Sequence, residues 1–130
     1  MNLLLDTHVF LWWDDANPKL GQDAARAIAD PGNLVYVSAA SVWELVLKRQ
    51  TGRLVLSRSP GAAIERNGFL ALPISAAHTE RTGVLPPLHR DPFDRLLVAQ
   101  AQLESLTLVT ADAKVAAYPV AQLWAGAARR

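Results

Sequence analysis

The chain has 130 residues, of which 51% are hydrophobic and 19% are charged, proportions that suit one folded domain and fit poorly with a disordered chain. Its formal net charge of +1 does not by itself indicate nucleic-acid binding. The absence of cysteine excludes disulfides, thiolate metal sites and a cysteine nucleophile, and favours a cytoplasmic protein. We expect neither a signal peptide nor a membrane-spanning segment, because the sequence opens with no basic region and no long apolar run.

Short β-forming runs alternate with helical stretches along the chain. Strands are predicted at Leu3–Leu5, Leu34–Val37, Phe69–Ile74 and Thr107–Thr110. Helices are predicted at His8–Trp13, Gln22–Ala29, Ser38–Gln50, Ser59–Gly68, Ser75–Thr82 and Pro92–Leu103, with a further helical turn after Asp112. This alternation predicts one α/β domain over residues 1–124, with a mostly parallel sheet, and a frayed tail at residues 125–130.

Four carboxylates are expected at one edge of that sheet. Asp6 follows the first predicted strand and Asp112 follows the last one, while Glu44 lies early in the helix after the second strand. Asp94 lies in the first turn of the helix that begins at Pro92. Because ligands bind at the carboxyl ends of strands in open parallel sheets, these four side chains could share one site.

Such a cluster suggests a divalent cation. Carboxylates that are packed together repel each other and raise each other's pKa values unless a cation lies among them. Oxygen ligands suit Mg²⁺ or Mn²⁺, and such a cation can activate a water molecule and neutralise charge on a phosphate. The cluster therefore predicts phosphodiester hydrolysis.

Each acid also has a simpler structural explanation, because Asp6, Asp91, Asp94 and Asp112 all stand where a carboxylate could cap a helix or a turn. Glu44 could complete a capping box with Ser41, although Ser38 is an equally good N-cap. Thr110 could be a simple β-former, or its hydroxyl could orient Asp112. The positions taken jointly favour chemistry, since four independent caps need not share one edge.

Cationic and aromatic residues near these acids have two interpretations. Candidate contacts to the phosphates of a substrate are Arg90, Arg95, Lys48, Arg49 and Arg53. For the last three a solvated charged face is favoured, and Arg95 could instead pair with Asp91 one helical turn away. His8, His78 and His89 lack metal-ligand spacing. His89 lies near the acids and could contact substrate, but a structural role is favoured for it. The tryptophans are expected in the core or at a dimer interface.

Four stretches of this chain resemble the PIN-domain ribonucleases, in the branch of VapC-like toxins from type II toxin–antitoxin pairs. They are Leu3–Trp13, Val37–Leu45, His89–Ala101 and Leu108–Asp112. They occur in the family's order, and the resemblance extends from Leu3 to Trp124. It implies an α/β/α sandwich around a central parallel sheet.

The resemblance also implies a set of site residues. Asp6, Glu44, Asp94 and Asp112 fall on the family's acidic positions, and Asp91 falls on a further acidic position of this branch. Thr7 and Thr110 match hydroxyl residues that support the first and last acids. In the mechanism we hypothesise, Asp6, Asp94 and Asp112 hold Mg²⁺ or Mn²⁺ directly or through water. Glu44 completes the metal's ligands or accepts a proton from the attacking water.

The implied function is that of an endoribonuclease toxin. A metal-activated water would hydrolyse RNA to leave a 5′-phosphate and a 3′-hydroxyl. The implied partners are RNA, a second copy of the chain in a homodimer, and a cognate antitoxin that blocks the acidic groove. DNA would be contacted only through the antitoxin, and no membrane is involved.

Three other functions can be compared with the same residues. A phospho-receiver domain needs an aspartate at the end of a middle strand, where this chain has Val37 and Ser38. A phosphoaspartate phosphatase needs Asp-x-Asp after the first strand, where this chain has Asp6-Thr7-His8. The non-enzymatic alternative is a binding subunit whose acidic groove holds a basic segment of a partner, and it predicts neither metal dependence nor cleavage.

Overall fold

The computed structural model describes residues 1–127, and within them five parallel strands form one sheet. The strands are β1 (Asn2–Leu5), β2 (Leu34–Ser38), β3 (Leu70–Leu72), β4 (Thr107–Thr110) and β5 (Gln122–Trp124). Their spatial order is β3-β2-β1-β4-β5, and every neighbouring pair is parallel. The predicted parallel sheet is therefore confirmed.

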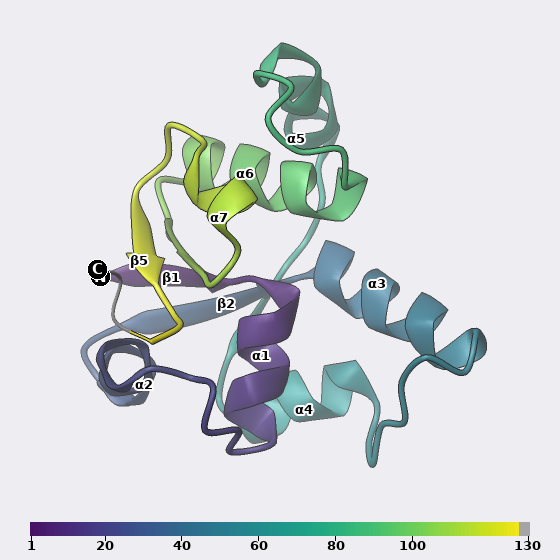
Figure 1. The fold of residues 1–130 in the computed structure, drawn as a ribbon, viewed down its shortest axis with the longest axis vertical. Coiled ribbons are helices and arrows are strands. Elements are labelled where there is room, and N and C mark those ends of the chain that lie inside the picture. The colour runs from purple at the N-terminus through teal and green to yellow at the C-terminus, as the bar shows by residue number, and fades with distance from the viewer. Residues whose placement is uncertain (128–130) are drawn as a thin grey trace.

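Helices cover both faces of the sheet (Figure 1). They are α1 (Thr7–Asp14), α2 (Gln22–Ala29), α3 (Ala39–Gln50), α4 (Pro60–Arg66), α5 (Ala76–Arg81), α6 (Pro92–Glu104) and α7 (Ala113–Ala116), with a 3₁₀ helix, η1, at Thr82–Val84. Helices α6 and α7 lie on one side of the sheet, and α1, α2 and α4 lie on the other. The expected α/β/α sandwich is confirmed.

The β1 strand shows why its sequence is apolar without interruption. Leu3 and Leu5 pack into the core beneath α1, α2 and α4, whereas Leu4 packs into the core beneath α6 and α7. Successive side chains of a strand point to opposite faces, so a strand that is covered on both sides must be apolar at every position.

The strand order creates a crevice between β1 and β4. From β1 the chain builds outward through β2 to β3, and then returns to the other side of β1 to form β4 and β5. At such a reversal the neighbouring connections leave in opposite directions, which opens space at the carboxyl ends of the two strands. Asp6 directly follows β1, and Asp112 lies two residues after β4.

The C-terminal part of the chain differs from the prediction. No strand was expected after Thr110, yet β5 pairs with β4, and Trp124 lies opposite Thr110. Ala125 is buried, donates its N–H to the Thr110 carbonyl at 2.8 Å and accepts from Gly21 N at 2.7 Å. The expectation that a frayed tail begins at Ala125 is therefore wrong for this residue, and residues 128–130 of that tail lie outside the described residues.

Two smaller features complete the fold. Strand β3 is shorter than its predicted range of Phe69–Ile74, because only Leu70–Leu72 pairs with β2. Within residues 1–127, no helix has the length and the apolar character needed to cross a membrane.

Candidate active site

Asp6 and Asp112 each cap the helix that follows their strand. Asp6 Oδ1 accepts the N–H of Val9 at 2.8 Å, and Asp112 Oδ1 accepts the N–H of Lys114 at 2.8 Å. The strand ends and the caps together place both carboxylates in the crevice between β1 and β4. The structural explanation and the chemical one are therefore compatible for these two acids, since a cap occupies only part of a carboxylate.

The Thr110 hydroxyl connects the same two acids. It accepts the backbone N–H of Asp112 at 3.1 Å, and its hydrogen bond to Asp6 favours the ionised form of that carboxyl. Asp6 is only 4% exposed, and this burial raises its pKa in spite of the hydrogen bonds from Thr110 and Val9 and the charge of His8. The Asp112 carboxylate raises it further.

Asp94 shows that the acids interact with one another. Burial and the Asp91 carboxylate raise its pKa to about 7, although the hydrogen bond with His89 opposes them. The carboxylates of Asp6 and Glu44 raise it further. Asp94, Asp6 and Glu44, which come from different parts of the sequence, thus act on one another electrostatically.

Glu44 is buried on α3 and is bound through both of its oxygens. Its Oε1 accepts the Thr7 hydroxyl at 2.7 Å, and its Oε2 lies 3.0 Å from Lys48 Nζ. The N-cap of α3 is Ser38, so Glu44 does not complete a capping box with Ser41. The Ser41 hydroxyl instead lies 2.9 Å from the Thr7 hydroxyl, so that Thr7 ties the start of α1 to α3.

Asp91 is the N-cap of α6. Its Oδ1 accepts the backbone N–H groups of Phe93 at 2.8 Å and of Asp94 at 3.2 Å, and Pro92 takes the first helical position. This cap sets the start of α6 and therefore the place of Asp94, whose carboxylate lies beside His89.

His89 lies among the acids. Its Nε2 is 2.9 Å from Asp94 Oδ2 and 3.6 Å from Asp112 Oδ2, and its side chain is only 14% exposed. The three residues each offer one ligand atom, and these atoms all lie within 4.8 Å of one another. The sequence interpretation recognised that His89 lies near the acids but favoured a structural role, because the three histidines lack metal-ligand spacing. Its position at the end of a two-proline connector, five residues before Asp94, was the signal that could have placed it here.

The expected RNA-binding cations divide into two groups. Arg95 does not form the suggested pair with Asp91 and donates instead to the carbonyl oxygens of Thr82 at 2.7 Å and Pro86 at 3.1 Å. It also donates to the Tyr118 hydroxyl at 3.0 Å, so its role is to fix the connector against α6. Lys48 pairs with Glu44, whereas the exposed side chains are Arg49, Arg53 and Arg90.

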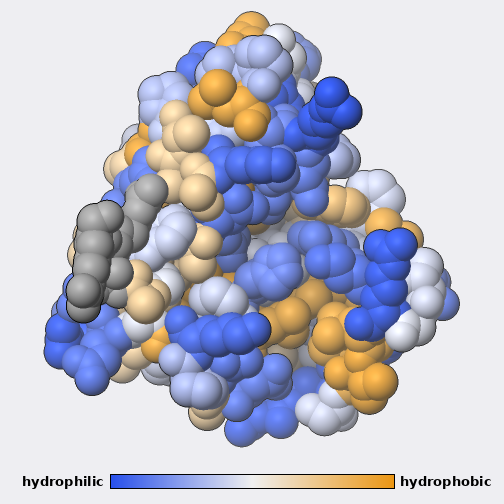
Figure 2. All heavy atoms as spheres, in the orientation of Figure 1, coloured by the Kyte–Doolittle hydropathy of each residue, from blue (hydrophilic) through white to orange (hydrophobic). Residues whose placement is uncertain are grey.

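Two cavities adjoin the acids. One of 460 Å³ is lined by Glu44 and Asp91 together with Lys48, Arg53, Arg90, Leu47, Thr51, Pro92 and Phe93. The other, of 310 Å³, is lined by Asp6, His8, Trp12, Ala111, Asp112 and Ala113. Figure 2 shows that hydrophilic side chains cover most of the visible face, while hydrophobic ones gather at the lower right. The 460 Å³ cavity, where three cationic side chains lie beside two acids, is the better candidate for binding the phosphates of a substrate.

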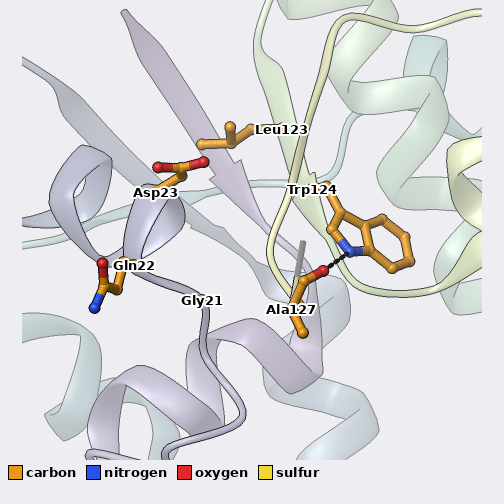
Figure 3. Close-up of a pocket in the computed structure, with 7 residues that line it drawn as sticks. Gly21, Gln22, Asp23, Leu123, Trp124 and Ala127 are labelled. Carbon is orange, nitrogen blue, oxygen red and sulfur yellow. Dashed lines mark hydrogen bonds between the residues drawn. The ribbon is translucent and has the colours of Figure 1, made fainter. Parts of the chain in front are cut away.

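A third cavity of 510 Å³ lies where α2 begins and β5 ends (Figure 3). It contains none of the four predicted acids. Its carboxylate is Asp23, which is exposed and paired with Arg26 at 2.6 Å. The two cavities that adjoin the acids are therefore the candidate site, although this third one is larger than either of them.

The donor set fits a divalent cation. Asp94 and Asp112 offer oxygen atoms and His89 offers a nitrogen atom at mutual distances that one ion can bridge. Burial, and after it the neighbouring carboxylates, raises the pKa of Asp94, and a cation bound beside it would stabilise the ionised form.

Comparisons with known proteins identify the family and the fold. A family model of the PIN domain matches residues 3–121. The comparison with curated proteins found no match.

Among solved structures, the chain is similar to a chain in the crystal structure of VapBC2 from Rickettsia felis bound to a DNA fragment from its promoter. The TM-score is 0.68 at 17% identity, over 95% of this chain and 99% of that chain. For a toxin–antitoxin complex from Klebsiella pneumoniae the TM-score is 0.63 at 20% identity, with coverage of 94% and 96%. For FitAcB from Neisseria gonorrhoeae the TM-score is 0.58 at 21% identity, over 94% of this chain and 96% of that chain. At sequence identities this low, the similarity to these structures establishes a shared fold and nothing beyond it.

Proposed function

Since the chain belongs to the PIN domain family, we propose that it is a Mg²⁺- or Mn²⁺-dependent endoribonuclease that acts as the toxin of a type II toxin–antitoxin module. The observation that carries this proposal is the grouping of Asp6, Glu44 and Asp94, which interact electrostatically, with Asp112, which lies beside His89 as Asp94 does. The interaction of the first three is evident in the raised pKa of Asp94, and Asp112 raises the pKa of Asp6.

The proposed reaction is hydrolysis of an RNA phosphodiester. When bound, the cation supplies Lewis acidity at the phosphate and lowers the pKa of a water molecule. Asp6, Asp94 and Asp112 hold it directly or through water, with Asp91 a further candidate ligand. Glu44, which Thr7 and Lys48 orient, accepts a proton from the attacking water. Water adds to phosphorus and the bond to the 3′ oxygen breaks, so that a 5′-phosphate and a 3′-hydroxyl remain.

The proposed RNA path runs over the cationic cavity. Lys48, Arg53 and Arg90 line it beside Glu44 and Asp91, and Arg49 lies on the same helix as Lys48. Cations at this place would attract phosphates that the acids alone would repel. Arg95 is not proposed as an RNA contact, because its guanidinium is bound to carbonyl oxygens.

The proposed partners follow from the family and from similar structures. Structures with this fold include toxin–antitoxin complexes, and one was solved on promoter DNA. We propose that a cognate antitoxin covers the acidic site of this chain, that the chain forms a homodimer, and that DNA is reached only through the antitoxin.

The test is cleavage of a pool of cellular RNA by the purified chain with Mg²⁺, with Mn²⁺ and with EDTA. We expect discrete products that disappear with EDTA and fall by at least about a hundredfold in Asp6→Asn and Asp94→Asn. The matched control is Asp23→Asn, which removes the same charge at an exposed position. Circular dichroism confirms that each variant is folded.

Two outcomes would contradict the proposal. Undiminished metal-dependent cleavage by Asp6→Asn would show that the proposed acids do not form the catalytic site. Absence of cleavage with either metal by the folded chain, across RNA pools from several sources, would favour the binding subunit that holds a basic partner segment.

A further inference from the structure

We propose that His89 Nε2 is a direct ligand of the divalent cation, in a mixed nitrogen–oxygen site that it forms with Asp94 and Asp112. The sequence predicts a site built from carboxylates alone, so this assigns a new ligand and a different donor set. The inference rests on the proposed function, because it concerns the same cation.

The distances match the spacing of neighbouring ligands around one ion. An octahedral Mg²⁺ or Mn²⁺ ion with bonds of about 2.1 Å has adjacent ligand atoms about 3 Å apart. His89 Nε2 lies 2.9 Å from Asp94 Oδ2 and 3.6 Å from Asp112 Oδ2. All three ligand atoms lie within 4.8 Å of one another, so small side-chain movements suffice for them to share an ion.

The backbone of His89 is held in place by contacts from distant parts of the chain. Its N–H donates to the Tyr118 hydroxyl at 3.0 Å, and that hydroxyl lies 3.5 Å from its carbonyl oxygen. Arg95 on α6 donates to the same hydroxyl at 3.0 Å. A ligand that is fixed in advance loses little conformational freedom when the ion binds.

The remaining two acids have other partners. Asp6 accepts hydrogen bonds from Val9 and Thr110, and Glu44 is bound to Thr7 and Lys48. Neither belongs to the group of mutually close ligand atoms among residues 1–127. Their role in this arrangement is to contact water molecules around the ion and to orient them.

A competing explanation predicts the opposite change in cation affinity when His89 is removed. If His89 only paired with the acids in place of a cation, the ion would have to displace it, and removing the imidazole would strengthen cation binding. If His89 is a ligand, removing it weakens cation binding. A nitrogen ligand also favours Mn²⁺ over Mg²⁺ more than an all-oxygen site does.

The probe is Mn²⁺ alone, added to the metal-free full chain and followed by electron paramagnetic resonance. Pulsed measurements on the wild-type chain should show coupling of the ion to a directly bound ¹⁴N nucleus. Selective ¹⁵N labelling of histidine should replace that signal with a ¹⁵N signal. The coupling should vanish in His89→Ala and His89→Gln and persist in His8→Ala, an exposed histidine beside the same site. Titration should show Mn²⁺ affinity reduced by roughly 10- to 100-fold in both His89 variants.

The outcomes separate this inference from the proposed function. Bound Mn²⁺ without nitrogen coupling, or equal or tighter binding by folded His89→Ala, would overturn the ligand role and leave the nuclease proposal standing. Failure of the folded wild-type chain to bind Mn²⁺ at all would overturn both. The labelling experiment on the wild-type chain decides the question even if a His89 variant does not fold.

Discussion

Asp94 combines the effects of burial and of neighbouring charge in a single side chain. Its carboxyl has a pKa of about 7, against an ordinary value of 3.8, because burial and the carboxylates of Asp91, Asp6 and Glu44 all disfavour ionisation. His89 is the neighbour that favours the ionised form. A residue that is this costly to ionise is poorly explained by helix capping alone, because Asp91 already supplies the cap.

The raised pKa predicts how stability depends on pH without metal. Between about pH 4 and pH 7 the folded chain keeps the Asp94 proton while the unfolded chain releases it. The free energy of unfolding should therefore fall as pH rises through this window, by a few kcal/mol at most, since one pKa unit corresponds to about 1.4 kcal/mol. Urea unfolding in EDTA at pH 5 and pH 8 measures this fall, which should shrink in Asp94→Asn.

The matched control is Asp23→Asn, whose pH dependence should equal that of the wild-type chain. Added Mg²⁺ should restore more stability at pH 8 than at pH 5, because the cation binds the ionised carboxylate. If the free energy of unfolding of Asp94→Asn depended on pH as fully as that of the wild-type chain, the pH dependence would not come from the raised pKa of Asp94.

The first turn of α6 combines a structural role and a chemical one. Asp91 accepts two backbone N–H groups through one oxygen, Pro92 begins the helix, and Asp94 follows in the first turn. The same few residues thus start the helix and deliver the carboxylate to the crevice. The cap accounts for Asp91 without a metal, although it leaves the second oxygen of this carboxylate available.

Two substitutions distinguish a cap from a ligand at Asp91. Asp91→Ala should lower the free energy of unfolding by about 1 kcal/mol, whereas Asp91→Asn should retain stability because an amide oxygen also caps helices well. We expect Asp91→Asn to keep metal affinity within about tenfold of the wild-type value, as measured by Mn²⁺ titration, because an N-cap needs no charge. A stable Asp91→Asn chain that no longer binds Mn²⁺ would instead identify Asp91 as a ligand.

At the scale of the whole molecule, a close backbone contact joins the start of α2 to the segment after β5. Gly21 N donates to the Ala125 carbonyl at 2.7 Å, and the labelled residues in Figure 3 show how near these two segments lie. A Cβ atom built on Gly21 would lie 2.3 Å from the backbone oxygen of Gly126. This contact secures the edge of the sheet beside β4, the strand that leads to Asp112.

We therefore expect Gly21→Ala to destabilise the fold by about 1–3 kcal/mol, since one of two backbones must move to admit the methyl group. The control is Gly61→Ala in α4, where a Cβ meets no atom within 4 Å and where alanine should be neutral or stabilising by up to about 1 kcal/mol. Thermal unfolding of both variants measures the difference. Equal stability of Gly21→Ala and the wild-type chain would mean that the two segments separate freely.

The order of the elements up to β4, the parallel sheet and the positions of several acids at helix starts could be predicted from sequence because they depend on local information. The uninterrupted apolar run Leu3–Leu5 indicates a strand that is buried on both faces. Asp6, Asp91 and Asp112 each stand where a helix begins after a strand or a loop. Neither property requires knowledge of a distant residue, and the carboxyl ends of parallel strands necessarily share one edge.

The tertiary structure alone decided which groups touch. Strand β5 has only three residues, and such a short strand is stabilised by its pairing with β4 more than by its own composition. Contacts between different elements include the hydrogen bond of Thr7 with Glu44, the carbonyl oxygens that bind Arg95, and the place of His89 between Asp94 and Asp112. Contacts of this kind follow from how helices and strands pack. Residue type and local spacing therefore predicted a candidate chemistry, and packing determined the geometry of the groups that would carry it out.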